Sequence, residues 1–383
     1  MAEPLSEMDA QETKSYAILL AGGSGSRLWP VSRQRYPKQL ARFAGRDSMI
    51  QSVIKRVAPA IDFSRIKVVC GAEHCHDISR HMEEAGISPE GKIYVEPCGR
   101  NTAPAILLGA LHILSEEKDA ICCVFPADHV IKDEARFNQK LQAAIRLASQ
   151  GHMVTFGIRP HYPETGYGYI EGGEKVLDGA LSIKRFVEKP PRETAEAYIE
   201  AGNFFWNSGM FAFKASVLIE EMNTHLPGLV RDMRAMLSKG GEIPLEDYRR
   251  LPDISIDHAI MEKTRRGVAL PADFGWSDIG TWKSLYDFLP KDENQNVISG
   301  DVVARNARGC LIMGHKRLVV ANHLTDMVIV ETPDSIFVSD LKNSREVKSV
   351  VEDLKKEGRA ECRRHVPEYH SGEDGPALTK KMS

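Results

Sequence analysis

The sequence predicts an α/β fold, with a domain built on a mostly parallel sheet followed by a smaller β-rich region. Before about residue 292, short segments rich in Ile, Val and Phe alternate with longer segments of helical period. This alternation is typical of parallel strands joined by crossover helices. Beyond residue 292, short apolar segments are separated by small turn residues, which predicts short strands. We therefore expect an α/β domain over 15–291 and a β-rich region over 292–358.

The apolar runs and helical periods place the elements of the first domain. We expect strands at 16–21, 65–70, 92–96, 120–125, 154–158 and 182–187, and helices at 48–57, 74–84, 104–115 and 135–149. The strands are apolar throughout, as in a sheet that helices cover on both faces. Ligands of such sheets bind at the carboxyl ends of the strands. The residues that follow each strand are therefore the first candidates for chemistry.

The second region carries only short apolar segments before a final helical period. We expect strands at 302–304, 310–313, 318–320, 327–330 and 335–338, and a closing helix at 344–356. The segments show no fixed period, so periodicity alone does not indicate a solenoid. A polar extension over 1–14 and a polar tail over 359–383, which we expect to be flexible, flank the two regions.

Composition excludes several classes of protein. The 383 residues carry a net charge of −3 and are 42% hydrophobic, enough for a large core. The apolar runs are far shorter than the roughly 20 residues that cross a bilayer, and the N-terminus lacks a signal sequence. We expect a cytoplasmic protein that binds neither membranes nor nucleic acid in general, because no basic block is present. The seven cysteines show no zinc spacing, which favours reduced, mostly buried thiols.

A glycine-rich loop follows the first strand directly. It reads Ala21, Gly22, Gly23, Ser24, Gly25, Ser26 and Arg27, and Lys38 follows eleven positions later. Glycines let the backbone turn tightly and expose consecutive N–H groups to an anion. Neither the Walker ending nor GxGxxG is present. The nearby cations favour phosphate binding over the alternative, a plain glycine turn before a helix.

Eight ordered segments then point to one family. They are AGGSGSRLWPVSRQRYPKQL (21–40), EPCGRNTAPA (96–105), FPADH (125–129), GYGYI (166–170), FVEKP (186–190), WNSGMF (206–211), SIDHAIMEK (255–263) and WSDIGTW (276–282). Together they resemble the sugar nucleotidyltransferases, in particular those that act on mannose 1-phosphate and GTP, over about residues 15–340. The resemblance implies a Rossmann-like nucleotidyltransferase domain followed by a small left-handed β-helix-like region.

The resemblance also implies a reaction, in which mannose 1-phosphate and GTP give GDP-mannose and pyrophosphate. Two polyanions must then lie side by side, and one unit pair of like charges about 4 Å apart costs about 4 kcal/mol at an effective dielectric near 20. Positioning and electrostatic stabilisation carry such reactions. The resemblance places Arg27, Lys38 and Lys189 as the catalytic cations. It places the glycine loop with Asn101, Thr102 and Asp128 on the nucleotide.

Two carboxylates are the candidates for a Mg²⁺ site. Asp128 follows an apolar strand and Asp278 lies in the WSDIGTW segment. Magnesium prefers one or two carboxylates together with phosphate oxygens. The alternatives are a turn residue and a carboxylate at a helix N-terminus, and spacing alone cannot pair residues so far apart. The resemblance favours the metal role for both.

The sugar-binding candidates come from three motifs. The resemblance assigns Tyr167, Gly168, Glu188, Lys189 and Asn207 to mannose and its phosphate. Without the resemblance, Glu188 and Lys189 would be interpreted as a solvated ion pair. Gly168 and Asn207 would be interpreted as turn residues.

Several residues in these motifs have simpler interpretations. Asn101 or Thr102 could also cap a helix that has Pro104 in its first turn. We interpret His129 and His258 as structural, because the attacking phosphate oxygen is already ionised near neutral pH. We interpret all four tryptophans as packing residues.

Two rival functions remain open. One is a nucleotidyltransferase for another base or sugar, such as a glucose-1-phosphate thymidylyltransferase. The other is a non-catalytic regulatory protein that binds GDP-mannose. The presence of all the expected cations and carboxylates favours an enzyme. The isomerase domain that many bacterial relatives carry at the C-terminus is not expected, and the sequence leaves the oligomeric state open, a homodimer included.

Overall fold

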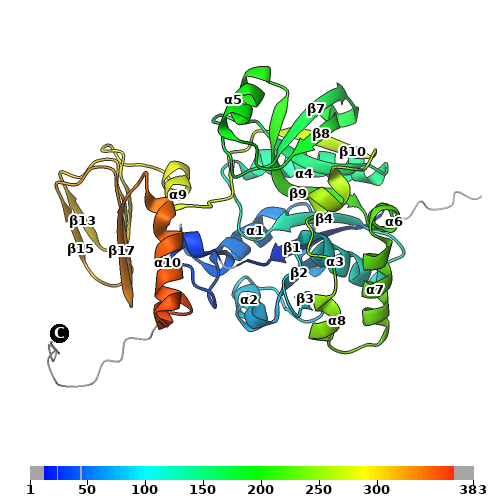
Figure 1. Ribbon diagram of the computed structural model, residues 1–383, viewed down its shortest axis with the longest axis horizontal. Helices are drawn as coiled ribbons and strands as arrows, with labels where there is room; N and C mark the ends of the chain where they lie inside the picture. The colour runs from blue at the N-terminus through cyan, green and yellow to red at the C-terminus, as the bar shows by residue number, and fades with distance from the viewer. Residues whose placement is uncertain (1–12, 24, 44, 366–383) are drawn as a thin grey trace, which may run out of the picture. The chain divides into compact units, whose positions relative to one another are not determined.

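The first of two compact units is built on one large sheet (Figure 1). The computed structural model describes residues 13–23, 25–43 and 45–365. The first unit contains the described residues up to Gly23 and those of Gln39–Ile279. Its sheet has the strand order β3-β2-β1-β4-β9-β6-β10-β8-β7.

The strands of this unit are β1 (Ser15–Ala21), β2 (Ile66–Gly71), β3 (Ile93–Glu96), β4 (Ile121–Pro126), β5 (Val130–Ile131), β6 (Met153–Ile158), β7 (Tyr169–Lys175), β8 (Leu181–Val187), β9 (Phe204–Lys214), β10 (Gly267–Ala272) and β11 (Trp276–Ser277). The helices are α1 (Met49–Val57), α2 (Cys75–Glu84), α3 (Thr102–Glu116), α4 (Glu134–Ser149), α5 (Arg192–Ala201), α6 (Ala215–His225), α7 (Pro227–Ser238) and α8 (Leu245–Arg249). Every strand and helix predicted in this domain is present, with ends within two residues of the prediction.

Strands β1 to β4 pair in parallel, as predicted, within a sheet that is mixed as a whole. Strand β1 lies between β2 and β4 and runs parallel to both, and β6 runs parallel to β10. The eleven-residue strand β9 runs antiparallel between β4 and β6. The sequence predicted no strand at β7, β9 or β10, and Asn207, Ser208 and Gly209 explain the omission of β9, because they interrupt its apolar run.

Helices pack on both faces of the sheet. Cys122 and Val124 of β4 share a hydrophobic cluster with residues of α3, α6 and α7. Phe125, the next residue of β4, faces the other way and contacts Phe137 of α4, with ring centroids 5.9 Å apart. Successive side chains of a strand point to opposite faces, so the sheet is buried on both sides at β4. There, polar groups can reach solvent at the ends of the strands, whereas β8 also exposes Lys184 and Arg185 along its length.

The second unit contains the predicted β-rich region and its closing helix. Its elements are α9 (Trp282–Phe288), β12 (Val297–Ser299), β13 (Val302–Arg305), β14 (Leu311–Met313), β15 (Val319–Asn322), β16 (Met327–Thr332), β17 (Ser335–Asp340) and α10 (Val347–Lys356). Strands β12, β14 and β16 pair in parallel, as do β13 and β15. Val297 pairs with Leu311 and Leu311 with Val328, offsets of 14 and then 17 residues. These unequal offsets explain why the sequence showed no fixed period.

The second unit also contains residues 25–38, the rest of the glycine-loop motif. Arg33 donates to the Asp334 carboxylate at 2.8 Å, and the Arg33 side chain is fully buried. The Trp282 indole donates to the Trp29 carbonyl at 3.0 Å. These contacts join positions 301 and 253 residues apart in sequence. The boundary that we predicted at residue 291 therefore differs from the division of the compact units, which falls after Ile279.

The remaining expectations concern cysteines and membrane segments. All seven cysteines are free, and five of them are buried. Among residues 13–23, 25–43 and 45–365 no helix has both the length and the apolar character that crossing a lipid bilayer requires. The predicted extension lies outside the described residues up to residue 12, and the predicted tail lies outside them from residue 366.

The buried Arg33–Asp334 pair predicts a large stability effect. Asp334→Asn leaves a buried guanidinium without its charge partner, which should lower the free energy of unfolding of the second unit by about 3–5 kcal/mol. Arg231 and Asp232 form an exposed pair at 2.8 Å, and Asp232→Asn should change stability by less than about 1 kcal/mol. Hydrogen exchange at increasing urea concentration measures both effects. The β16 and β17 amides report on Asp334→Asn, and the α7 amides report on Asp232→Asn. Equal, small effects would contradict the prediction.

Candidate active site

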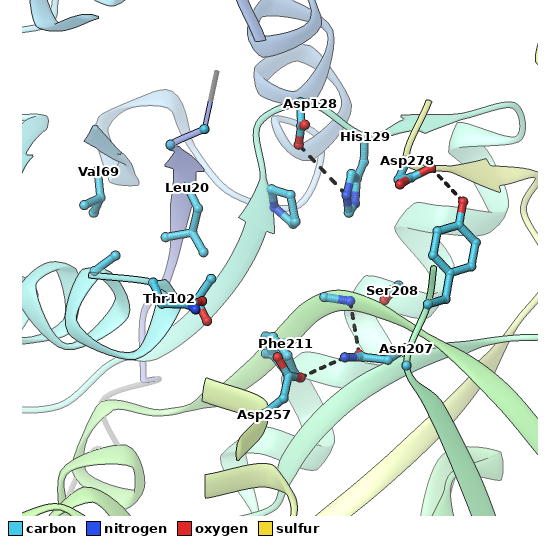
Figure 2. A pocket seen from close by; sticks show the side chains of 18 of the residues that line it. Leu20, Val69, Thr102, Asp128, His129, Asn207, Ser208, Phe211, Asp257 and Asp278 are labelled. Atoms are coloured by element: carbon cyan, nitrogen blue, oxygen red, sulfur yellow. Dashed lines mark hydrogen bonds and ion pairs between the residues drawn. The ribbon is translucent and has the colours of Figure 1, made fainter. Parts of the chain in front are cut away.

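A cavity of about 460 Å³ opens at the carboxyl ends of the parallel strands in the first unit (Figure 2). Leu20 of β1, Val69 of β2, Glu96 of β3 and Pro126 of β4 all line it. This edge is where ligands bind in open α/β sheets. The predicted site residues that line this cavity are Gly22, Gly23, Asn101, Thr102, Asp128, Tyr167, Gly168, Glu188, Asn207 and Asp278.

The two predicted metal carboxylates reach the same cavity because of one short strand pair. Strands β5 and β11 pair antiparallel, with Ser277 opposite Val130. Asp278 directly follows β11 and Asp128 comes two residues before β5. This register carries both carboxylates to the cavity, although they are 150 positions apart in sequence. The residue after Asp278, the buried Ile279, has a φ of 41°, which is unfavourable for a β-branched side chain.

Each carboxylate has a neighbour that orients it. The Tyr167 hydroxyl donates a hydrogen bond to Asp278 Oδ1 at 2.6 Å. Burial, reinforced by the negative charge of Asp278, raises the pKa of Tyr167, so this hydroxyl remains a donor. His129 Nε2 lies 3.9 Å from Asp128 Oδ1. Because the Trp276 indole donates to His129 Nδ1 at 3.2 Å, the proton of a neutral His129 lies on Nε2 and faces Asp128.

The predicted sugar residues meet because β7 pairs with two strands. Tyr169 pairs with Val187 of β8 and with Trp206 of β9. The residues next to these three pairing positions are Gly168, Glu188 and Asn207. The backbone N–H of Asn207 donates to the Gly168 carbonyl at 2.8 Å. A Cβ atom at Gly168 would lie 2.8 Å from Glu188 Oε2. A side chain at position 168 would therefore displace the Glu188 carboxylate.

Lys189 lies beside this group but does not line the cavity. Its ammonium pairs with the Glu188 carboxylate, and 61% of its side chain is exposed. Its φ of 44° is left-handed, an uncommon conformation for a lysine. Such backbone strain is frequent at functional sites.

Helix α3 begins at the cavity. Asn101 is its N-cap, and the Asn101 side chain accepts from the Thr102 amide at 3.0 Å. The Thr102 hydroxyl accepts from the Ile256 amide at 2.9 Å. Pro104 lies in the first turn, as the sequence indicated. Both predicted nucleotide residues are thus held by the helix start.

The glycine loop is divided between the two units. Gly22 and Gly23 line the cavity, and the Ala21 carbonyl accepts from Gln39 Nε2 at 2.8 Å. Ser24 lies outside the described residues. The other predicted loop residues, Gly25, Ser26, Arg27 and Lys38, belong to the second unit.

Within the second unit, Gly25 and Lys38 lie in contact. Gly25 has a φ of 59°, and a Cβ atom there would lie 2.5 Å from Lys38 Cβ, so the site requires glycine. Arg27 is exposed and Lys38 is buried.

Comparison with known proteins identifies the family. Residues 16–295 match the model of the nucleotidyl transferase family, and residues 300–354 match that of the MannoseP isomerase/GMP-like beta-helix domain. The chain belongs to the nucleotidyl transferase family. This confirms the resemblance found in the eight motifs and the β-helix character of the second unit.

Individual relatives cover most of this nucleotidyl transferase. It is 40% identical over 361 residues to a mannose-1-phosphate guanylyltransferase of Klebsiella pneumoniae, a match that covers 92% of this chain and 76% of that one. It is 42% identical over 360 residues to the xanthan biosynthesis protein XanB of Xanthomonas campestris pv. campestris, with the same coverage. The crystal structure of a mannose-1-phosphate geranyltransferase from Thermus thermophilus superposes with a TM-score of 0.81 at 33% identity, covering 89% of this chain and 99% of that one.

Nucleotidyl transferases generally use a divalent metal ion, and the cavity offers ligands for one. In the part of the chain that the structure describes, no three His, Cys, Asp or Glu side chains cluster closely enough to hold a metal. Asp128 and Asp278 supply the pair of hard oxygen donors that Mg²⁺ takes from proteins when substrate phosphates complete its shell. The residues present fit such a shared site.

The sequence analysis missed two acidic residues of the cavity, Glu96 and Asp257. Tyr248 donates to Glu96 Oε1 at 2.5 Å, and burial raises the pKa of Glu96 to about 7. Asn207 Nδ2 donates to Asp257 Oδ1 at 2.7 Å, and burial raises the pKa of Asp257 to about 6. Both carboxylates lie in matched motifs, which was the one available signal. A motif cannot show which of its side chains points into a cavity.

The raised pKa of Glu96 predicts a pH-dependent stability. Burial favours the neutral acid, so the stability from this group is complete below about pH 4.5 and is lost as the pH rises through about 7. Glu96→Gln keeps an acceptor for Tyr248 but cannot ionise. Its unfolding free energy relative to wild type should therefore rise by about 2 kcal/mol between pH 5 and pH 8.

Urea denaturation at the two pH values measures this difference. Glu200→Gln, at an exposed position, is the control and should show no such change. A difference between Glu96→Gln and wild type that stays constant with pH would show that Glu96 is charged throughout.

Proposed function

We propose that this nucleotidyl transferase is a mannose-1-phosphate guanylyltransferase. It transfers GMP from GTP to α-D-mannose 1-phosphate and releases GDP-mannose and pyrophosphate. One observation carries the proposal, namely that a single cavity is lined by some of the residues expected for the nucleotide, for the metal and for the sugar, among them Gly22, Asp128 and Asn207. The relatives named mannose-1-phosphate guanylyltransferase supply the identity of the substrates.

The cavity suggests the order of the bound groups. Gly22, Gly23 and the start of α3 lie at the ends of β1 and β3 and take the guanosine. Gly168, Glu188 and Asn207 take the mannose ring. Asp128 and Asp278 take a Mg²⁺ ion. When bound, this ion neutralises phosphate charge.

The transfer itself requires no covalent bond between the protein and either substrate. An oxygen of the mannose phosphate forms a bond to the α-phosphorus of GTP while the bond from that phosphorus to the bridging oxygen of pyrophosphate breaks. The attacking oxygen is already ionised, so no general base is needed. Arg27 and Lys38 are assigned to the triphosphate and Lys189 to the sugar phosphate. Their cations reduce the repulsion between the two substrates.

The side chains around the reacting groups act by positioning. Tyr167 holds Asp278 through its 2.6 Å hydrogen bond. His129 presents an N–H to Asp128. Both contacts exist before substrate arrives, so little reorganisation is needed during the reaction. We also propose the cytoplasm as the compartment of this nucleotidyl transferase.

Substrate choice tests the proposed function. We expect purified protein with Mg²⁺ to release pyrophosphate from GTP and mannose 1-phosphate together, and from neither alone. GTP, ATP, dTTP and UTP should each be assayed against mannose, glucose and galactose 1-phosphates. A preference for dTTP with glucose 1-phosphate would replace the proposal with the thymidylyltransferase alternative. Tight binding of GDP-mannose without turnover would replace it with the regulatory alternative.

The two carboxylates have a direct test. Asp128→Asn and Asp278→Asn should each lower kcat at least about 100-fold, because each weakens an ion worth several kcal/mol of transition-state stabilisation. Asp273→Asn changes an exposed carboxylate just after β10 and outside this cavity, and should leave kcat within twofold. Circular dichroism checks that all three variants fold. Near-normal turnover in either cavity variant would remove that residue from the metal site.

A further inference from the structure

Asp257 reaches the sugar side of the cavity from an unusual turn. It begins a π-helical turn, Asp257–Met261, and lines the cavity beside Asn207 (Figure 2). Glu188 lines the same cavity. Turns of the π type are rare and are frequently found at functional sites. The family resemblance assigned no role to Asp257.

The amide that contacts Asp257 is held at both ends. Asn207 Oδ1 accepts from the Gly209 amide at 3.1 Å and from the Thr155 hydroxyl at 3.3 Å. Its Nδ2 is therefore oriented toward Asp257, to which it donates at 2.7 Å. If the donor and acceptor ends of Asn207 exchanged, the bonds to the Gly209 amide and to Asp257 would be lost, because a backbone N–H only donates and an ionised carboxylate only accepts. Asn207 thus positions the Asp257 carboxylate.

The Asp257 carboxylate can accept further hydrogen bonds. Among the described residues, one side chain donates to it, the Asn207 amide, and that bond uses Oδ1. A carboxylate has about four acceptor positions, and a mostly buried one is costly while they are unfilled. Burial raises the pKa of Asp257 even though the Asn207 side chain and the backbone N–H of Asp257 itself both donate to the carboxylate. A ligand that donates hydrogen bonds would fill the remaining acceptor positions.

The neighbouring charges define which ligand fits. Glu188 approaches the same cavity wall across Gly168, and its charge adds to the rise in the pKa of Asp257. The Lys189 ammonium pairs with Glu188 and can hold a phosphate, whereas the Asp257 carboxylate repels phosphate or a sugar acid and attracts a neutral group rich in hydroxyls. A hexose ring has this chemistry, whereas its phosphate does not. The ring should therefore turn its hydroxyls toward Asp257 and its phosphate away.

We propose that Asp257 is a specificity-determining residue of the sugar subsite, whose carboxylate accepts a hydrogen bond from one ring hydroxyl of the hexose 1-phosphate. This inference rests on the proposed function. A site built around a substrate hydroxyl rejects the analogue that lacks it, because its buried acceptor is then left unpaired.

The test pairs Asp257→Asn with deoxy substrates. Wild type and variant are assayed with mannose 1-phosphate and with its 2-, 3-, 4- and 6-deoxy analogues, with pyrophosphate release as the readout. We expect the variant to raise KM for mannose 1-phosphate about tenfold and to leave KM for GTP within twofold. One deoxy analogue should lose about tenfold in kcat/KM with wild type and no more than twofold with the variant. If Asp257 were merely structural, the variant would still lose about tenfold in kcat/KM with that deoxy analogue.

Controls separate the possible outcomes. Asp253→Asn alters an exposed carboxylate four residues upstream and should keep the wild-type penalties. Asp257→Ser removes the carboxylate with a smaller side chain, and it replaces Asp257→Asn if that variant fails to fold by circular dichroism. If wild type is active and all deoxy penalties persist in the Asp257 variants, this inference is wrong and the proposed function stands. If wild type forms no GDP-mannose, both fall.

Discussion

Strand register is the constraint on which the cavity depends. Two short pairings bring its acidic and polar groups together. The β5–β11 pair carries Asp128 and Asp278 to one cavity, and the pairing of β7 with both β8 and β9 gathers Gly168, Glu188 and Asn207. Side chains alternate along a strand, so a shift of one residue would turn these groups away from the cavity. The buried faces of the large sheet hold that register in place.

The distribution of charge within the cavity follows from the substrates. Carboxylates alone would repel phosphate, yet the cavity wall carries Glu96, Asp128, Glu188, Asp257 and Asp278. In the proposed mechanism these acidic residues have two different roles. Asp128 and Asp278 act through a cation, whereas Glu188 and Asp257 face neutral hydroxyls. Carboxylates thus attract phosphate where a cation binds between them and the phosphate, and they repel it where no cation does.

Much of the fold and part of the site could be predicted. Most strands and helices up to residue 187, though not β5 and β7, follow from apolar periodicity, because a strand buried on both faces must be apolar along its length. Strand β9 could not be predicted this way, since its polar centre serves the cavity rather than the core. Among the site residues, Asn101 as a helix cap and Asp128 at a strand end follow from local rules. Asp257 and Glu96 do not, because only the fold shows where they point.

The sequence by itself determined the order of the elements, the family and the kind of chemistry. Local periodicity, turn residues and motif spacing are properties of neighbouring positions, and a single chain displays them. Tertiary structure alone decided that residues 25–38 fold with strands about 300 positions later, and that Asn207 holds Asp257. Such contacts depend on register and close packing between distant segments. No local pattern encodes them, because many pairings of the same segments would satisfy the same periodicity.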